Sequence, residues 1–152
     1  MHIGIHLCRG NMAGSTSILE GSYEAIAKKL FTELDYDTFY LEYDNERAGD
    51  FAPLRHLPVG KNVVLGVVSS KDPELEDLDE LVERVGEAAD VIAKGQGRTR
   101  EEAVRNVLGV SPQCGFASMS EAGGVGMTEE RMWEKLVLVR DLARRIWPDE
   151  AI

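Results

Sequence analysis

Residues 63–69 read Val-Val-Leu-Gly-Val-Val-Ser, an apolar run broken only by one glycine. A short continuous apolar run is typical of a strand buried on both faces, as in a parallel sheet. The stretch before it, 44–62, holds two glycines and two prolines and is expected to be a loop. After it, Asp72-Pro73 is expected to open a helix, with the proline at the first helical position. The run therefore predicts a central strand between a loop and a helix.

Strand and helix patterns alternate on both sides of this run. The segment 22–34 has apolar residues at the 3.6-residue period, which predicts a helix. Gly95 and Gly97 are expected to end the helix that opens at Asp72-Pro73, and Thr99 with Glu102 forms a capping box for a short helix. Strands are expected over 3–8, 38–43, 63–69 and 107–114, and helices over 22–34, from Pro73 to Gly95, over 99–106 and over 128–147.

This alternation predicts the fold class: an α/β protein with a parallel sheet and right-handed crossovers. A complete eight-unit barrel needs about 250 residues, or about 31 per unit. The 152 residues hold four such units. We expect a single domain over 1–152 that is either a parallel (βα)4 half of a TIM-type barrel or a small open α/β sheet.

Such a sheet would leave both of its outer strands, 3–8 and 110–114, without a neighbour. Unpaired strand edges invite pairing with another chain. The barrel-facing side chains, either Val64 with Val68 or Leu65 with Val67, would also lose their cover. We therefore expect a homo-oligomer or a complex with a separate N-terminal half-barrel.

Charge and composition limit the other partners. The 17 Lys and Arg against 27 Asp and Glu give a formal net charge of -10, which disfavours nucleic acid and anionic membrane surfaces. No apolar run is long enough to span a bilayer, and the first residues show no secretion signal. Two cysteines that lie far apart make no disulfide framework, so we expect reduced thiols and a cytoplasmic location.

His6 and Cys8 stand two residues apart on the first expected strand, so they project from the same face of the sheet. A neutral imidazole and a thiolate are good zinc ligands. The alternative is a buried thiol beside a hydrogen-bonded histidine. Two other histidines are rival ligands: His2 lies at the far end of the strand and His56 in a loop, and both are expected on the surface.

Glu42 and Cys114 come at the ends of two further strands, and parallel sheets place their sites at the carboxyl ends of strands. Taken singly, Glu42 is typical of a solvated carboxylate and Cys114 of a small buried residue. Together with His6 and Cys8 they offer four ligand groups on one rim, enough for a tetrahedral zinc ion.

Several longer stretches carry a resemblance to a known family. The sequence resembles the C-terminal half of the catalytic barrel of cobalamin-independent methionine synthase, especially the shorter, core-type bacterial and archaeal members. The matching stretches are 6–11 (His-Leu-Cys-Arg-Gly-Asn), 40–44 (Tyr-Leu-Glu-Tyr-Asp), 47–51 (Arg-Ala-Gly-Asp-Phe), 64–71 (Val-Leu-Gly-Val-Val-Ser-Ser-Lys) and 111–118 (Ser-Pro-Gln-Cys-Gly-Phe-Ala-Ser).

The resemblance implies a zinc-dependent methyltransferase. In that family a methyl group moves from 5-methyltetrahydrofolate to homocysteine, and zinc activates the thiol. The implied zinc ligands are His6, Cys8, Glu42 and Cys114. The implied partners are homocysteine or another small thiol and a methyl-folate donor. Epoxyalkane–coenzyme M transferases are similar to this family, so a zinc-dependent thiol alkyltransferase is the alternative. A third possibility is a truncated zinc-binding half-barrel that is inactive without a partner.

Two features near the implied site remain open. Better-known members of the family carry a histidine proton donor just after the third of these strands, where this chain has Ser70 and Lys71. We expect one of these two to take that catalytic role. Asp44, Arg47 and Asp50 follow Glu42. They either support the site, contact the substrate or form a surface ion-pair cluster.

Overall fold

A computed structural model describes residues 1–10, 18–117 and 126–150 of the chain. In chain order, the elements are β1 (Gly4–Leu7), α1 (Glu24–Glu33), β2 (Thr38–Glu42), the 3-10 helices η2 (Glu46–Ala48) and η3 (Ala52–His56), β3 (Asn62–Val68), α2 (Leu78–Gln96), α3 (Arg100–Asn106), β4 (Leu108–Pro112) and α4 (Glu129–Ile146). The capping box of Thr99 and Glu102 is present at the start of α3, as predicted.

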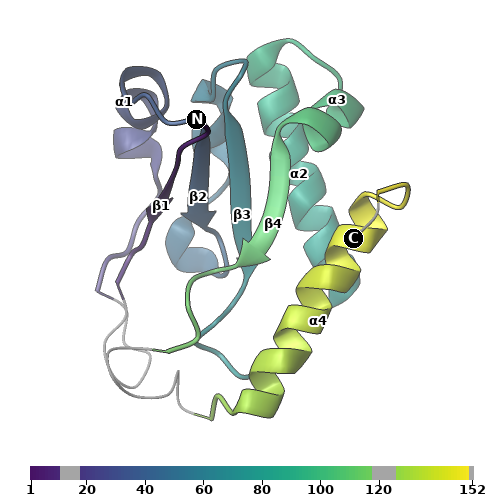
Figure 1. The fold of residues 1–152 in the computed structure, drawn as a ribbon. Coiled ribbons are helices and arrows are strands. Elements are labelled where there is room, and N and C mark those ends of the chain that lie inside the picture. Colours follow the sequence, from purple (N-terminus) through teal and green to yellow (C-terminus); the bar gives the residue numbers. More distant parts are fainter. Residues whose placement is uncertain (11–17, 118–125, 151–152) are drawn as a thin grey trace.

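The four strands form one parallel sheet in the order β1-β2-β3-β4 (Figure 1). His6 lies opposite Tyr40, Tyr40 opposite Val64, and Val64 opposite Gly109. The prediction of a parallel α/β sheet is therefore confirmed. In the part of the chain that the structure describes, β1 and β4 are the outer strands and each lacks a second neighbour.

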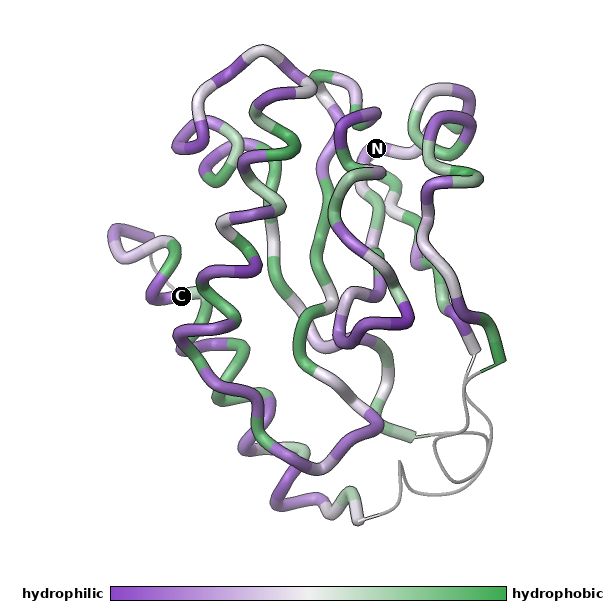
Figure 2. The backbone as a smooth tube through the Cα atoms, turned by 180° about the vertical axis from the view of Figure 1, so that it is seen from behind, coloured by the Kyte–Doolittle hydropathy of each residue, from purple (hydrophilic) through white to green (hydrophobic). Residues whose placement is uncertain are grey.

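Among the described residues, helices and loops cover one face of the sheet and leave the other open. Seen from behind, the helices and the β2–β3 connection lie in front of the strands (Figure 2). Phe39 and Leu41, which point to this face, are 0% and 1% exposed, whereas Tyr40 between them is 41% exposed. Of the two alternatives for the open face, Leu65 and Val67 are buried in the core. In the other pair Val64 is partly exposed, whereas Val68 is fully buried, so only Val64 fits the open face.

Two helices differ from the sequence-based expectation. Helix α1 buries a narrower stripe than its apolar pattern predicts, because Ile26 and Leu34 are exposed. Helix α2 begins at Leu78 and not at Pro73, because the Asp77 side chain caps it by accepting the N–H groups of the first turn. The segment with Asp72-Pro73 belongs to the loop that leaves β3.

The two glycines near the end of α2 have different roles. Gly97, with φ of 65°, ends the helix in the left-handed conformation, as expected. Gly95 lies inside the helix, and a side chain there would collide with the backbone of Arg55, because a Cβ atom would come within 2.4 Å of the Arg55 carbonyl oxygen. Gly95 thus allows η3 to pack closely against α2.

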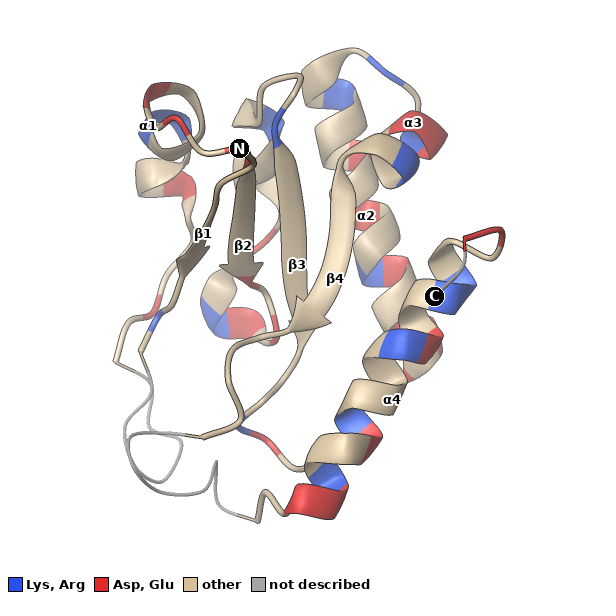
Figure 3. Ribbon diagram, in the orientation of Figure 1, with Lys and Arg blue, Asp and Glu red and all other residues tan. Residues whose placement is uncertain are grey.

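Charged residues lie mainly on the helices and loops, and the strands are almost free of them (Figure 3). Within the four described strands, Glu42 is the only Asp, Glu, Lys or Arg. None of the described helices combines the length and the apolar character that crossing a membrane requires.

Candidate metal site at the carboxyl ends of the strands

The structure brings together His6, Cys8, Glu42 and Cys114. One ligand atom from each lies within 4.8 Å of the others. His6 is on β1, Cys8 follows it directly, Glu42 is the last residue of β2, and Cys114 follows β4. The predicted convergence is therefore present. His2 and His56 are outside this cluster of described residues, and the His2 ring contacts the Thr38 hydroxyl at 2.7 Å, near the amino end of β2.

The path of the chain after β4 explains how Cys114 comes close to Cys8, although their strands lie at opposite edges of the sheet. Three strand spacings of about 4.8 Å separate β1 from β4 in a flat sheet. Yet the Sγ atoms of Cys8 and Cys114 are 3.9 Å apart. The exit from β4 turns across the end of β3, where the Gln113 N–H donates to the Val68 carbonyl at 2.7 Å.

Gly66 makes this turn possible. A Cβ atom at position 66 would lie 2.9 Å from the Cα atom of Gln113, so the β4 exit could not approach β3 so closely with any other residue there. The strand register also shifts between Gly66 and Val68. The glycine in the middle of the apolar run is thus required by the turn that carries Cys114.

The two thiols lie in an anionic environment. Burial raises the pKa of the Cys114 thiol, and the neighbouring Cys8 and Glu42 raise it further. The Gly10 N–H points to the Cys8 sulfur at 3.3 Å. Bringing two ionisable thiols and a carboxylate together is unfavourable without a cation, and these donor types are those that zinc prefers.

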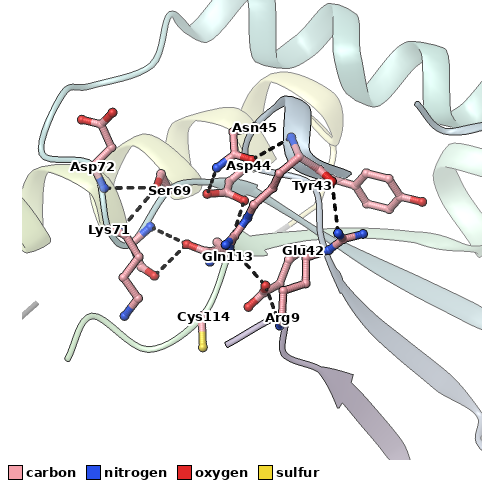
Figure 4. A network of polar contacts seen from close by, with 12 residues as sticks. Arg9, Glu42, Tyr43, Asp44, Asn45, Ser69, Lys71, Asp72, Gln113 and Cys114 are labelled. Atoms are coloured by element: carbon pink, nitrogen blue, oxygen red, sulfur yellow. Dashed lines mark hydrogen bonds and ion pairs between the residues drawn. The ribbon is translucent and has the colours of Figure 1, made fainter. Parts of the chain in front are cut away.

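Glu42 is fully buried, and its two carboxylate oxygens differ (Figure 4). Oε2 accepts the Arg9 N–H at 3.0 Å and lies 3.4 Å from the Arg47 guanidinium. Oε1 accepts no hydrogen bond from any described residue and lies 3.7 Å from Nε2 of His6. A buried carboxylate oxygen without a partner is costly, so this atom fits the role of a metal ligand.

The β2 end is held in place by Tyr23, at the start of α1. The Tyr23 hydroxyl accepts the Glu42 N–H at 3.0 Å and donates to the Glu42 carbonyl at 3.4 Å. Burial raises the pKa of Tyr23, which keeps this hydroxyl protonated. The backbone of the candidate ligand is therefore fixed as well as its side chain.

The residues after Glu42 divide into two groups. Asp44 and Arg47 are largely covered, with Arg47 Nη2 4.0 Å from Asp44 Oδ1, and burial raises the pKa of the Asp44 carboxyl. Asp50 is exposed and accepts the Ala52 N–H at the start of η3. Of the interpretations left open, support of the site fits Arg47 and Asp44, whereas Asp50 caps a turn.

Ser70 and Lys71 contact the turn around Cys114. The Ser70 hydroxyl donates to the Gln113 side chain at 3.2 Å. The Lys71 ammonium donates to the Gly115 carbonyl at 2.7 Å and to the Ala117 carbonyl at 3.0 Å. Neither belongs to the four-residue cluster, but both hold the segment that carries one of its members.

Arg9 is a site residue that the sequence did not single out. Its side chain is buried, donates to the carbonyls of Gly21 and Arg47, and lies over the Tyr23 ring at 4.2 Å. The sequence feature that could have pointed to Arg9 is its position directly after Cys8. Asn11 and Ser118, at the ends of two of the matching stretches, lie outside the described residues.

Comparison with known proteins identifies relatives over nearly the whole chain. The sequence model of a family described as cobalamin-independent synthase, catalytic domain, matches residues 2–127. Two proteins of Bacillus subtilis (strain 168), the uncharacterized proteins YxjG and YxjH, are each 40% identical over 146 residues. These matches cover 95% of this chain and 35% of each relative, so the chain spans about a third of their length.

Two solved structures resemble the fold. A putative vitamin-B12 independent methionine synthase from Listeria monocytogenes aligns with a TM-score of 0.65 and 35% identity, over 97% of this chain and 35% of that one. A B12-independent methionine synthase from Shewanella sp. W3-18-1, in complex with selenomethionine, aligns with a TM-score of 0.63 and 18% identity, over 97% of this chain and 39% of that one. These likenesses confirm the prediction that the fold is a parallel half of a TIM-type barrel.

Proposed function

Because the chain belongs to the family of the cobalamin-independent synthase catalytic domain, we propose that it is the zinc-binding part of a thiol methyltransferase. The proposed reaction transfers a methyl group from 5-methyltetrahydrofolate to homocysteine or another small thiol. The observation that carries the proposal is the convergence of His6, Cys8, Glu42 and Cys114, with one buried carboxylate oxygen facing the other donors.

The donor set suits activation of a thiol. A free thiol has a pKa of about 8.5 and is mostly protonated, hence a weak nucleophile, at neutral pH. Zinc held by these four side chains would supply a Lewis acid that keeps a substrate thiol ionised. The thiolates of Cys8 and Cys114 and the carboxylate of Glu42 bring more negative charge than a divalent ion neutralises, which keeps a bound thiolate electron-rich.

A proton must also reach the pterin that leaves when the methyl group is transferred. We propose that Ser70 or Lys71 supplies it. Their hydrogen bonds to Gln113 and Gly115 keep both residues beside the turn of Cys114, at the same end of the sheet as the four donors.

We further propose that the single domain over 1–152 corresponds to the C-terminal half of the catalytic barrel and does not act as a free monomer. The open face of the sheet, with Tyr40 41% exposed, and the unpaired edges of β1 and β4 support this. Either a separate N-terminal half-barrel or a second copy of the chain would cover them. Only the first would supply the other half of a barrel-type substrate site, so we expect the homodimer to be inactive.

Zinc analysis and solution mass, measured on one sample, test these proposals. We expect one zinc per chain in the wild type and loss of most of it in Cys8→Ser and in Cys114→Ser. His56→Ala removes an imidazole outside the cluster and serves as the matched control that keeps its zinc. Stoichiometric zinc in both cysteine variants would contradict the metal site.

Light scattering on the same sample tests whether the chain needs a partner. We expect a species heavier than the 16.8 kDa chain, or turnover only after an N-terminal half is added. A monomer that methylates homocysteine alone would contradict the need for a partner while leaving the metal site intact.

A further inference from the structure

The two oxygens of the Glu42 carboxylate are not equivalent. Oε2 is occupied on the protein side by the Arg9 N–H at 3.0 Å and by the Arg47 guanidinium at 3.4 Å. Oε1 is the atom left toward the candidate ligands, 3.7 Å from Nε2 of His6. A carboxylate that is free on both oxygens can rotate and bind a metal through either or both of them, whereas this one presents a single oxygen (Figure 4).

Arg47 is itself held in a fixed place. Its side chain is 8% exposed. Its backbone N–H donates to Oδ1 of Asn45 at 3.1 Å, at the start of η2. Its carbonyl accepts the Gly21 N–H at 2.9 Å and the Arg9 guanidinium at 3.1 Å. The backbone on which the guanidinium is mounted is therefore anchored to the segments before α1 and after β1.

Charge explains why a guanidinium is needed here. Glu42 and Asp44 are both buried, and Arg47 lies between them, 3.4 Å from one carboxylate and 4.0 Å from the other. Without a cation these two carboxylates would repel each other, and Glu42 would be pushed away from the geometry in which Oε1 faces His6. Arginine also contacts a carboxylate with a planar group, which fixes its orientation better than a lysine does.

We propose that Arg47 is a positioning residue that holds Oε2 of Glu42 and thereby restricts this ligand to binding the metal through Oε1 alone. The inference rests on the proposed zinc site and adds to it the residue that determines how its carboxylate binds. Partners that orient metal ligands typically change metal affinity by about 10–100-fold when they are removed.

Zinc affinity of purified variants, measured by competition with a chromophoric chelator, tests the proposal. We expect Arg47→Met to weaken zinc binding by about 10–100-fold and Arg47→Lys to weaken it less. Arg55→Met is the matched control, because Arg55 is about half exposed and pairs with Glu24 of α1, and neither residue belongs to the four-residue cluster. It should bind zinc as the wild type does.

A double-mutant cycle separates positioning of Glu42 from a general effect on the fold or on charge. In a Glu42→Gln background, adding Arg47→Met should weaken zinc binding no further. The cobalt-substituted protein gives an independent readout, since its visible absorption should differ between the wild type and Arg47→Met but not between the wild type and Arg55→Met.

The outcomes are distinct. Zinc binding by Arg47→Met that equals or exceeds the wild type, or an equal loss in the Glu42→Gln background, overturns the inference and leaves the proposed function standing. Absence of zinc from the wild type overturns the proposed function and the inference together. If circular dichroism shows that Arg47→Met does not fold, the double-mutant cycle is measured with Arg47→Lys in its place, because that variant keeps the positive charge. Its zinc affinities then test the inference by the same criteria.

Discussion

Phe39 and Tyr40 are neighbours on β2, and they show how different the two faces of this sheet are. The Phe39 ring is fully buried, in edge-on contact with Phe31 at a centroid distance of 5.0 Å, whereas Tyr40 on the opposite face is 41% exposed. The face covered by helices is a complete core within this chain. The open face is complete only if something else lies on it, and the candidate metal site stands at its edge.

The largest expected effect tests the covered face. Phe39→Ala should lower the free energy of unfolding by about 3–5 kcal/mol, because it leaves a cavity in a close-packed core. Tyr40→Ala, the matched control on the open face, should cost less than about 1 kcal/mol. Urea denaturation of both variants at low protein concentration measures the two values. Equal losses would mean that a second copy of the chain still covers Tyr40 at this concentration, so that the open face is not exposed in solution.

A smaller effect is expected at the rim, where the two faces meet. Lys71→Met removes the charged donor from the carbonyls of Gly115 and Ala117 and should cost about 1.5–3 kcal/mol. It should also weaken zinc binding, because these contacts hold the turn of Cys114. Lys29→Met, on the exposed surface of α1, is the control that should change neither property.

The same variant tests the proposed proton donor. In the active complex, the pH–rate profile should change in Lys71→Met or in Ser70→Ala. If both variants keep the profile of the wild type, neither residue donates the proton, and the effect of Lys71 on the Cys114 turn is its only role.

The smallest expected effect concerns the edge strand β1, whose amino end is held by Asp37. The Ile3 N–H, which donates to the Asp37 carboxylate at 2.6 Å, holds the pKa of that carboxyl below its ordinary value, with smaller contributions from the charges of His2 and Lys61. A lowered pKa in the folded state stabilises the fold above the ordinary value, about 3.9, and this stabilisation is lost as the pH falls through the folded value.

Asp37→Asn should therefore reduce the fall in unfolding free energy on acidification below about pH 4, as measured by urea denaturation at a series of pH values. Asp35→Asn is the control, since Asp35 is fully exposed and, among the described residues, its contact is an ion pair with Lys61. A wild-type pH dependence in Asp37→Asn would show that the amino end of β1 is not held by this carboxylate in solution.

The sequence predicted the sheet and the four converging donors because both depend on local pattern. The apolar run and the alternation of elements follow from periodicity, and the carboxyl ends of neighbouring parallel strands must lie on one rim. What the sequence did not predict depends on distant contacts. The start of α2 was misplaced because Asp77 caps it and Pro73 does not, although both residues are typical of helix starts.

The support around the cluster could be predicted from the sequence only in part: site support by Asp44 and Arg47 was one of the interpretations left open, and Arg9 was not singled out. Arg9 and Arg47 are 38 positions apart and meet only because η2 folds back against the segment after β1. An arginine beside a strand end is common in any sequence, and only the fold shows which carboxylate oxygen it contacts. The same holds for Gly66, whose missing side chain matters because the exit from β4 crosses there.

The separation of Cys8 and Cys114 by 106 positions has a consequence for how the chain matures. Among the four described strands, β1 is synthesised before β4, so a nascent chain carries His6 and Cys8 long before Cys114 exists. Closing such a long loop costs entropy that must be offset by docking of all four strands. Tight metal uptake by the proposed site would therefore be a late event in folding, and the rate of zinc binding would report when β4 joins the sheet.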